Sequence, residues 1–176
     1  MATEIIPISE AHIDGYNACL TSVAQERRWL GFVGSADLSR SQEFVRNNLT
    51  SGNPHFVALD GERVVGWCDI VRRSLEGFRH VGGLGMGVMK DYRGQGIGEQ
   101  LASAALQGAR TIGLERVELD VYASNNAAIK LYEKLGFAVE GVHRRARKLD
   151  GQYDDLISMA LFLDAPVADP GQEDMS

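Results

Sequence analysis

The chain has 176 residues, of which 44% are hydrophobic and 24% charged, and its formal net charge is −6. This size and composition indicate one globular domain, whereas the acidic balance disfavours nucleic-acid binding and no apolar run approaches the ~18 residues needed to cross a membrane. The N-terminus lacks the basic and apolar segments of a secretory signal, and Cys19 and Cys68 have no metal-type spacing. We therefore expect buried thiols in a reducing compartment, the cytoplasm.

The first third of the chain is predicted to be helical. Ser9 is suited to cap a helix whose apolar side chains recur at spacings of three and four on one face: Ile13, Tyr16, Leu20 and Val23. Residues 27–32 combine large aromatics with glycine and indicate a loop. Ser39 with Gln42 three residues later has the pattern of a capping box, which predicts a second helix that ends at 52–54.

Strands are predicted from residue 55 onwards. Residues 55–59 and 63–71 flank Asp60-Gly61, a pair that favours a hairpin turn because both positions tolerate positive φ. A glycine-rich segment at 78–89 then holds a strand that ends at Val88. The remaining predicted elements are a helix at 97–112, an alternating strand at 115–122, a helix capped by Ser124 or Asn125 and ended by Gly136, and closing strands at 137–139 and 153–163 around the turn Asp150-Gly151.

The C-terminal segment 164–176 has two prolines, four acids and no base, which predicts a disordered acidic tail after a single domain of residues 1–163. With that tail set aside, 20 acids face 18 bases, so the predicted domain is nearly neutral. The order of elements predicts an α/β (α+β) domain with a mixed sheet and helices on both of its faces.

Glycine is concentrated between residues 77 and 98, which hold eight of the twenty glycines. Residues 93–98 follow a strand and open a helix, so their backbone N–H groups are suited to bind an anion such as pyrophosphate. Glu99 occupies the position where a dinucleotide fingerprint needs its third glycine, and no G-K-[ST] sequence follows, which excludes a P-loop. The pattern that remains is R-x-x-G-x-G, with Arg93, Gly96 and Gly98.

Two motifs resemble those of the GNAT superfamily of N-acetyltransferases. R-x-x-G-x-G is similar to the acetyl-CoA signature of that family, and residues 125–137 resemble its later motif, N-x-A-A-x-x-L-Y-x-x-x-G-F. The resemblance covers residues 55–163, and the closing segment is similar to small-amine acetyltransferases of amino acids or polyamines. It implies the GNAT fold, whose central mixed, mostly antiparallel sheet splays between two middle strands, with helices on both faces.

The resemblance also implies how acetyl-CoA would be held as co-substrate. Residues 86–88 would pair through their backbone with the pantetheine arm, and the amides of 93–98 would face the pyrophosphate. Asn125 would bond to the arm, although it equally suits a helix cap. Tyr132 is either a packing residue or the acid that protonates the leaving thiolate, since a phenol with a pKa near 10 stays protonated at neutral pH. The implied cofactor-binding residues are Met86, Gly87, Val88, Arg93, Gly94, Gln95, Gly96, Ile97, Gly98, Asn125 and Tyr132.

The general base is the least defined part of the predicted site. Many members of the family carry an acid on the strand before the glycine loop, but residues 82–88 offer none. Glu118 and Asp120 alternate with apolar residues on a central strand and are candidates, directly or through water. Asp69 and Glu76 are further candidates, and for each of these acids a surface role is the competing interpretation.

The acceptor site is expected opposite the cofactor, with Trp29, Phe32 and Tyr153 as candidate wall residues. The basic run 143–148 is either a solvated hairpin face or an attractant for an acceptor carboxylate, which favours an amino acid over a polyamine. No histidine pair has metal spacing and no serine or cysteine stands in a nucleophile-elbow context, so we expect no metal and a direct transfer in a ternary complex.

The predicted function is therefore acetyl transfer to the primary amine of a small molecule. The alternatives are acetylation of a protein N-terminus or lysine, and a non-catalytic acyl-CoA-binding module. We expect no nucleic-acid or membrane partner, and the resemblance allows a homodimer through the edge of the C-terminal strand.

Overall fold

The computed structural model describes residues 3–163 and contains a seven-stranded sheet in the order β1-β2-β3-β4-β5-β7-β6. The predicted tail lies outside the described residues. The elements are β1 (Glu4–Pro7), α1 (Ile13–Gln25), α2 (Leu38–Ser51), β2 (His55–Asp60), β3 (Arg63–Arg72), β4 (Val81–Val88), α3 (Ile97–Thr111), β5 (Arg116–Tyr122), α4 (Asn126–Lys134), β6 (Ala138–Leu149) and β7 (Gln152–Phe162), with short 3-10 turns at Glu10–His12, Glu76–Phe78 and Lys90–Tyr92.

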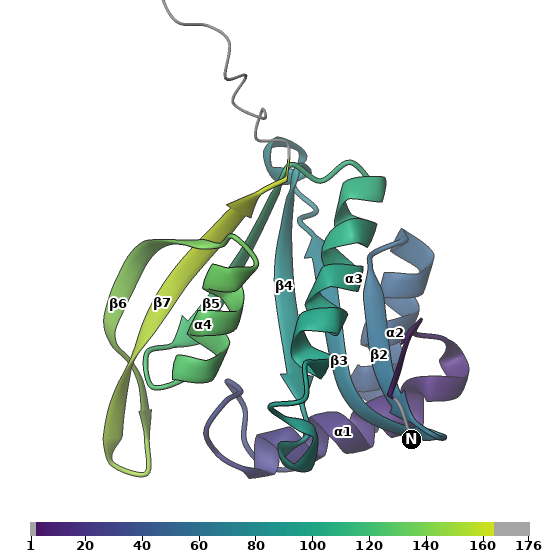
Figure 1. Ribbon diagram of the computed structural model, residues 1–176, viewed down its shortest axis with the longest axis horizontal. Coiled ribbons are helices and arrows are strands. Elements are labelled where there is room, and N and C mark those ends of the chain that lie inside the picture. The colour runs from purple at the N-terminus through teal and green to yellow at the C-terminus, as the bar shows by residue number, and fades with distance from the viewer. Residues whose placement is uncertain (1–2, 164–176) are drawn as a thin grey trace, which may run out of the picture.

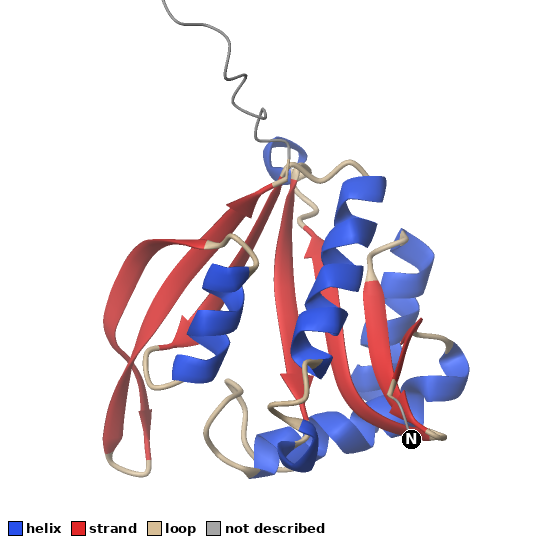
Figure 2. Ribbon diagram, viewed as in Figure 1, coloured by secondary structure: helices blue, strands red, loops and turns tan. Residues whose placement is uncertain are grey.

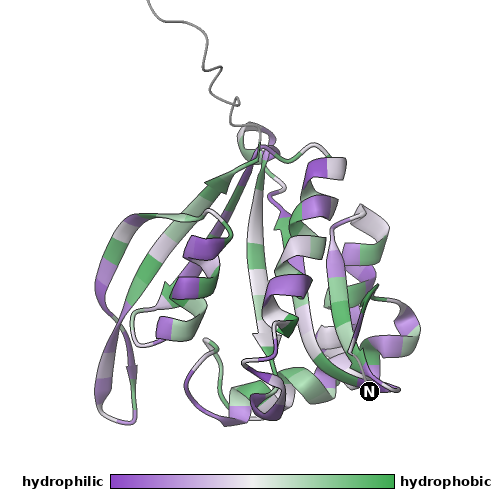
Figure 3. Cartoon of the chain, in the orientation of Figure 1, coloured by the Kyte–Doolittle hydropathy of each residue, from purple (hydrophilic) through white to green (hydrophobic). Residues whose placement is uncertain are grey.

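The helices cover both faces of the sheet, as the sequence predicted (Figures 1 and 2). Helices α1 and α2 lie on one face, where Val57 and Trp67 of the sheet join their core, and α3 packs on the other face with Cys68 and Ile70. Successive residues of β3 thus point to opposite cores, which is why this strand is apolar on both sides. Hydrophobic residues run along the central strands, whereas much of the free end of the β6–β7 hairpin is hydrophilic (Figure 3).

The sheet splays between β4 and β5. Strand β4 pairs antiparallel with β3 along Gly82–Val88, but it pairs parallel with β5 only at Val81, Gly82 and Gly83. Beyond these three positions the two strands diverge (Figure 1). This geometry confirms the mixed, mostly antiparallel sheet with a splay between its middle strands.

Several local predictions are corrected by the structure. Strand β1 was not predicted, because its four residues are too few for a periodic pattern and end in proline; it pairs with the edge of β2. The N-cap of α2 is Asp37, whose carboxylate accepts a hydrogen bond from the backbone N–H of Arg40 at 3.0 Å, and not Ser39. Ser9 caps the 3-10 turn that precedes α1 rather than α1 itself.

Other local predictions are confirmed. Asp150 and Gly151 have φ angles of 50° and 76°, the left-handed region that their hairpin turn requires. Asn125 caps α4, because its side-chain oxygen accepts a hydrogen bond from the N–H of Ala128 at 3.2 Å. Both cysteines are buried free thiols.

Candidate functional site

A cavity of about 840 Å³ occupies the splay between β4 and β5. It extends from the N-terminus of α3 and the start of α4 on one face of the sheet to the end of α1 and the loop after it on the other. Ten of the eleven residues predicted to bind the cofactor line it: Met86, Gly87, Val88, Arg93, Gly94, Gly96, Ile97, Gly98, Asn125 and Tyr132. Gln95 does not, because its side chain is exposed and donates to the carbonyl of Asp91 at 3.1 Å.

The glycine loop gives the cavity an electropositive end. Gly94 and Gly96 have φ angles of 72° and 79°, a conformation that other residues rarely adopt, and Gly96 is the N-cap of α3. Gly98 lies against Met86 and Leu131, each 3.3 Å from the position that a Cβ atom would take. The first N–H groups of a helix have no intrahelical acceptor, so this loop presents donors and a positive dipole end to an anion.

The side chain of Arg93 links this loop to the end of β4 and to Glu26. Its Nε donates to the carbonyl of Val88 at 2.8 Å, and its Nη1 donates to Glu26 at 2.8 Å. Burial favours the neutral acid, but the hydrogen bonds and charge of Arg93 lower the pKa of Glu26 overall. Glu26 also accepts a hydrogen bond from the indole of Trp29 at 3.0 Å, so Arg93 connects the glycine loop to the opposite wall of the cavity.

The edge of β4 that faces the cavity is without a strand partner from Leu84 onwards, since its pairing with β5 stops at Gly83. Leu84, Gly85, Met86, Gly87 and Val88 all line the cavity. An extended chain with amide groups fits such an edge, because it supplies the hydrogen bonds that a neighbouring strand would make.

Tyr132 lies on α4 with 7% of its surface exposed and packs its ring edge-on against Phe137 at 5.7 Å. Burial, with a smaller contribution from Cys68, raises the pKa of this phenol, so it stays protonated at neutral pH. Tyr132 is therefore a buried, protonated phenol that also forms part of the cavity wall.

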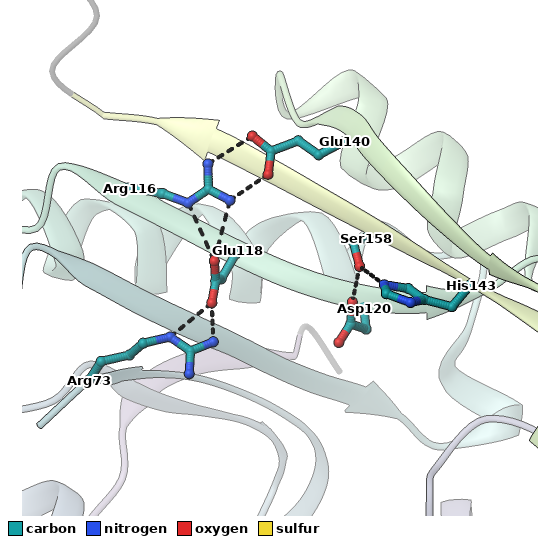
Figure 4. A network of polar contacts seen from close by, with 7 residues as sticks. All are labelled: Arg73, Arg116, Glu118, Asp120, Glu140, His143 and Ser158. Carbon is teal, nitrogen blue, oxygen red and sulfur yellow. Dashed lines mark hydrogen bonds and ion pairs between the residues drawn. The ribbon is translucent and has the colours of Figure 1, made fainter. Parts of the chain in front are cut away.

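The two acids predicted as bases occupy different positions on β5 (Figure 4). Glu118 forms ion pairs with Arg73 and Arg116, and Arg116 is also paired with Glu140. Glu118 lies in a second, smaller cavity of about 360 Å³ and not in the large one. The carboxylate is therefore occupied by two guanidinium groups.

Asp120 lies between the two cavities and lines both. Its Oδ1 accepts a hydrogen bond from Ser158 Oγ at 2.6 Å, and Ser158 Oγ lies 3.3 Å from His143 Nε2 (Figure 4). These contacts hold one carboxylate oxygen of Asp120 against β7 and leave the other oxygen for the cavity.

The three residues predicted as acceptor walls do not lie together. Trp29 lines the large cavity, but Phe32 and Tyr153, with 43% and 54% of their surfaces exposed, do not. Phe32 lies beyond the part of the loop that reaches the cavity, and Tyr153 lies near the hairpin turn beside Arg145 and Lys148.

Sequence reasoning missed four wall residues on the acceptor side: Leu30, Gly31, Tyr122 and Leu156. Tyr122 follows Asp120 by two residues on β5 and therefore lies on the same face of the strand. This period of two was the signal from which Tyr122 could have been predicted. Arg147 of the basic run covers the Tyr122 ring at 3.8 Å and donates to the carbonyl of Arg28 at 2.7 Å. This arginine therefore joins the hairpin to the loop after α1.

The glycines of β4 have a structural role that the sequence did not show. An added Cβ at Gly87 would lie 2.3 Å from the indole of Trp67, and one at Gly85 would lie 3.4 Å from both carboxylate oxygens of Asp69. Side chains of β3 thus cover the face of β4 that α1 and α2 share.

Two classes of feature are missing from residues 3–163. No helix there is long and apolar enough to cross a membrane. No group of three or more His, Cys, Asp or Glu side chains in that same range is arranged to hold a metal ion.

Comparison with known proteins identifies relatives of this chain. The model of the acetyltransferase (GNAT) family matches residues 21–137. An L-methionine sulfoximine/L-methionine sulfone acetyltransferase of Pseudomonas aeruginosa is 33% identical over 130 residues, 73% of this chain and 76% of that protein. The L-amino acid N-acyltransferase MnaT of Escherichia coli is 30% identical over 115 residues, 65% of this chain and 67% of that protein.

The fold has close counterparts among solved structures. The structure of yncA, a putative acetyltransferase from Salmonella typhimurium with acetyl-CoA, superposes with a TM-score of 0.87 at 22% identity and covers 98% of this chain and 100% of that one. The resemblance of the two motifs is thus confirmed by the family match over more than half of the sequence. The chain belongs to the acetyltransferase (GNAT) family.

Proposed function

We propose that this protein transfers the acetyl group of acetyl-CoA to the primary amine of an amino acid or a related small molecule. One observation carries the proposal: a single cavity brings together an anion-binding helix N-terminus, an unpaired strand edge and a buried phenol. These three features match the diphosphate, the amide-containing arm and the thiolate leaving group of an acyl-CoA.

The residues of the cavity divide the chemistry between them. Backbone N–H groups at 94–98 bind the diphosphate, and the free edge of β4 pairs with the arm. Asn125 caps α4 with its oxygen, which leaves its NH₂ group to donate to the arm. The hydroxyl of Tyr132 donates its proton to the sulfur as the C–S bond breaks, and burial keeps that proton in place until then.

The acceptor enters from the opposite face of the sheet. Trp29, Leu30 and Tyr122 line that side, and Asp120 supplies a negative charge that attracts the ammonium group of the acceptor. Of the two acids predicted as bases, Asp120 has the geometry for contact with the acceptor, because Glu118 is occupied by Arg73 and Arg116.

A small acceptor is favoured over a protein chain for two reasons. The names of two relatives specify L-amino acids or methionine derivatives as their substrates. In addition, Arg27 is paired with Asp150 at 2.7 Å and Arg147 with the carbonyl of Arg28, so the loop and the hairpin are joined across the acceptor side. An extended peptide bound on that side would have to pass this junction.

The test is release of free thiol from acetyl-CoA over a panel of acceptors. The panel contains the proteinogenic amino acids, methionine sulfone, methionine sulfoximine, spermidine and peptides with free N-termini. We expect turnover with one or more free amino acids and none with the peptides. Tight acetyl-CoA binding in calorimetry without turnover on any acceptor would instead identify a binding module.

A further inference from the structure

The face of β4 toward α1 and α2 has no side chains of its own around the middle of the strand, because Gly83, Gly85 and Gly87 alternate there. Two neighbours on β3 cover it. Trp67 is paired in register with Gly87 and lies over it, and Asp69 is paired with Gly85 and lies over it. Both carboxylate oxygens of Asp69 lie 3.4 Å from the position that a Cβ atom at residue 85 would take.

A second carboxylate lies at the same level across the splay. Gly83 is paired with Glu118 in the parallel register, which places Gly85 level with Asp120 two residues further along both strands. Gly85 and Asp120 both line the large cavity. Asp69 does not line the cavity itself but lies behind Gly85, so an amine at this level meets Asp120 directly, whereas its contact with Asp69 requires a bridging water beside Gly85.

The environment of Asp69 differs from that of Asp120. Asp69 has 6% of its surface exposed, and burial alone raises its pKa to about 8. The titratable groups around it are neutral near that pH, since burial raises the pKa values of Tyr16 and Cys68 and lowers that of His55 to about 4. Cys19 on α1, with its pKa raised to about 12, is neutral as well.

Asp120, by contrast, is exposed and held by Ser158. The exposed carboxylate of Asp120 is open to a cation, whereas the raised pKa of the buried Asp69 suits it to exchange a proton. The two acids are thereby suited to different tasks on the same amine.

We propose that Asp69 is the general base that takes a proton from the acceptor ammonium through a bridging water, while Asp120 holds that ammonium in place. This proposal rests on the proposed acetyl transfer. Asp69 of β3 reaches over Gly85 and so serves in place of the acid that β4 lacks.

Every proton that moves in this step can be traced. The ammonium gives one proton to the Asp69 carboxylate through the bridging water, and the nitrogen lone pair then attacks the thioester carbon to form the C–N bond. As the C–S bond breaks, the sulfur takes the proton of Tyr132. The second nitrogen proton restores Tyr132, and Asp69 returns its proton to solvent before the next turnover.

The experiment compares the pH profiles of Asp69→Asn and Asp120→Asn with that of the wild type, on the best amino-acid acceptor of the panel. We expect Asp69→Asn to lower kcat about 100-fold and to remove the limb of the profile with an apparent pKa near 8. Asp120→Asn should raise the acceptor KM about tenfold and keep that limb. Asp14→Asn, at an exposed position of α1 outside both cavities, is the matched control and should match the wild type.

A readout without catalysis checks the same group. The pKa of Asp69 in the fold lies above the ordinary value of 3.8, so the native state binds more protons than the unfolded chain between pH ~4 and ~8. Its stabilising effect is therefore complete at low pH and is lost as the pH rises through about 8. In urea unfolding, Asp69→Asn should lack this decline, because asparagine resembles the protonated acid at every pH.

The outcomes separate the two proposals. If the wild type acetylates no acceptor, the proposed function fails. If the wild type is active and Asp69→Asn keeps both its kcat and the limb on the acid side of the pH optimum, Asp69 is not the base. If that acid-side limb disappears in Asp120→Asn instead, the roles assigned to the two acids are wrong.

Discussion

Two walls of the cavity are built by different kinds of atoms. The cofactor-side wall, named for the proposed function, consists of β4, residues 93–98 and the start of α4, and it exposes backbone at five glycines: Gly85, Gly87, Gly94, Gly96 and Gly98. The acceptor-side wall is lined by side chains that include Trp29, Leu30 and Leu156, and pairs such as Arg27 with Asp150 hold the loop and the hairpin around it. A backbone wall constrains sequence to glycine at a few positions, whereas a side-chain wall is free to vary with the acceptor. The first wall contains the R-x-x-G-x-G motif, and we expect the second to determine which acceptor binds.

The largest effect is expected when a side chain is added to the cofactor-side wall at Gly96. Gly96→Glu forces a φ of 79° on a non-glycine residue and places a carboxylate at the helix N-terminus. We expect the Kd for acetyl-CoA to rise at least roughly 100-fold through charge repulsion, with the fold retained. Calorimetry with acetyl-CoA measures the Kd, and a far-UV circular dichroism spectrum checks the fold. Unchanged affinity would refute anion binding by this loop.

Removal of the phenol should affect turnover and not binding. Tyr132→Phe keeps the ring contact with Phe137 but has no proton to give. We expect kcat to fall about 100-fold with little change in the Kd for acetyl-CoA. Steady-state kinetics and calorimetry on one preparation separate the two, and equal kcat values in mutant and wild type would exclude Tyr132 from the proton transfer.

A smaller effect is expected where the two walls meet. Glu26→Gln weakens the contacts of Glu26 with Arg93 and Trp29 together. We expect the Kd for acetyl-CoA and the acceptor KM both to rise about fivefold, because one carboxylate supports both walls. Glu10→Gln, which breaks an exposed ion pair with Arg46 at 3.2 Å, is the control. A change in only one of the two constants would show that the walls are independent.

The smallest effect is expected at the exposed link between loop and hairpin. Arg27→Ala removes an ion pair whose two side chains are largely exposed, so salt screens it. The acceptor KM should rise about threefold at low ionic strength and match the wild type at 1 M salt. Measurement of KM at both salt concentrations tests this, and a change that persists in high salt would assign Arg27 a contact other than Asp150.

The difference between the walls also explains what the sequence could predict. The cofactor-side residues form a contiguous motif in which Gly96 must have positive φ, so they were identified by position. The acceptor-side wall depends on contacts such as the hydrogen bond from Arg147 to the carbonyl of Arg28, 119 residues apart. A local sequence pattern cannot predict contacts between residues so distant in the chain. Phe32 and Tyr153 are large and aromatic, but their neighbours in space, and not their chemistry, place them outside the cavity.

The two acids on β5 illustrate the same limit. Alternation correctly placed Glu118 and Asp120 on one face of the strand. It did not show that Arg73, from a different part of the chain, binds Glu118. Nor did any pattern show that Asp69 of the adjacent strand lies over the glycine at position 85, because that requires the register of β3 against β4.

The short ladder between β4 and β5 has a consequence for how the protein unfolds. Strands β1–β4 and strands β5–β7 are joined within the sheet by only three paired positions, Val81, Gly82 and Gly83. The two groups of strands are therefore candidates for separate cooperative units in hydrogen exchange. An acyl-CoA bound along the free edge of β4, as we propose, would bridge the two groups as an additional strand does. Its binding should raise the thermal midpoint and merge the two units into one transition.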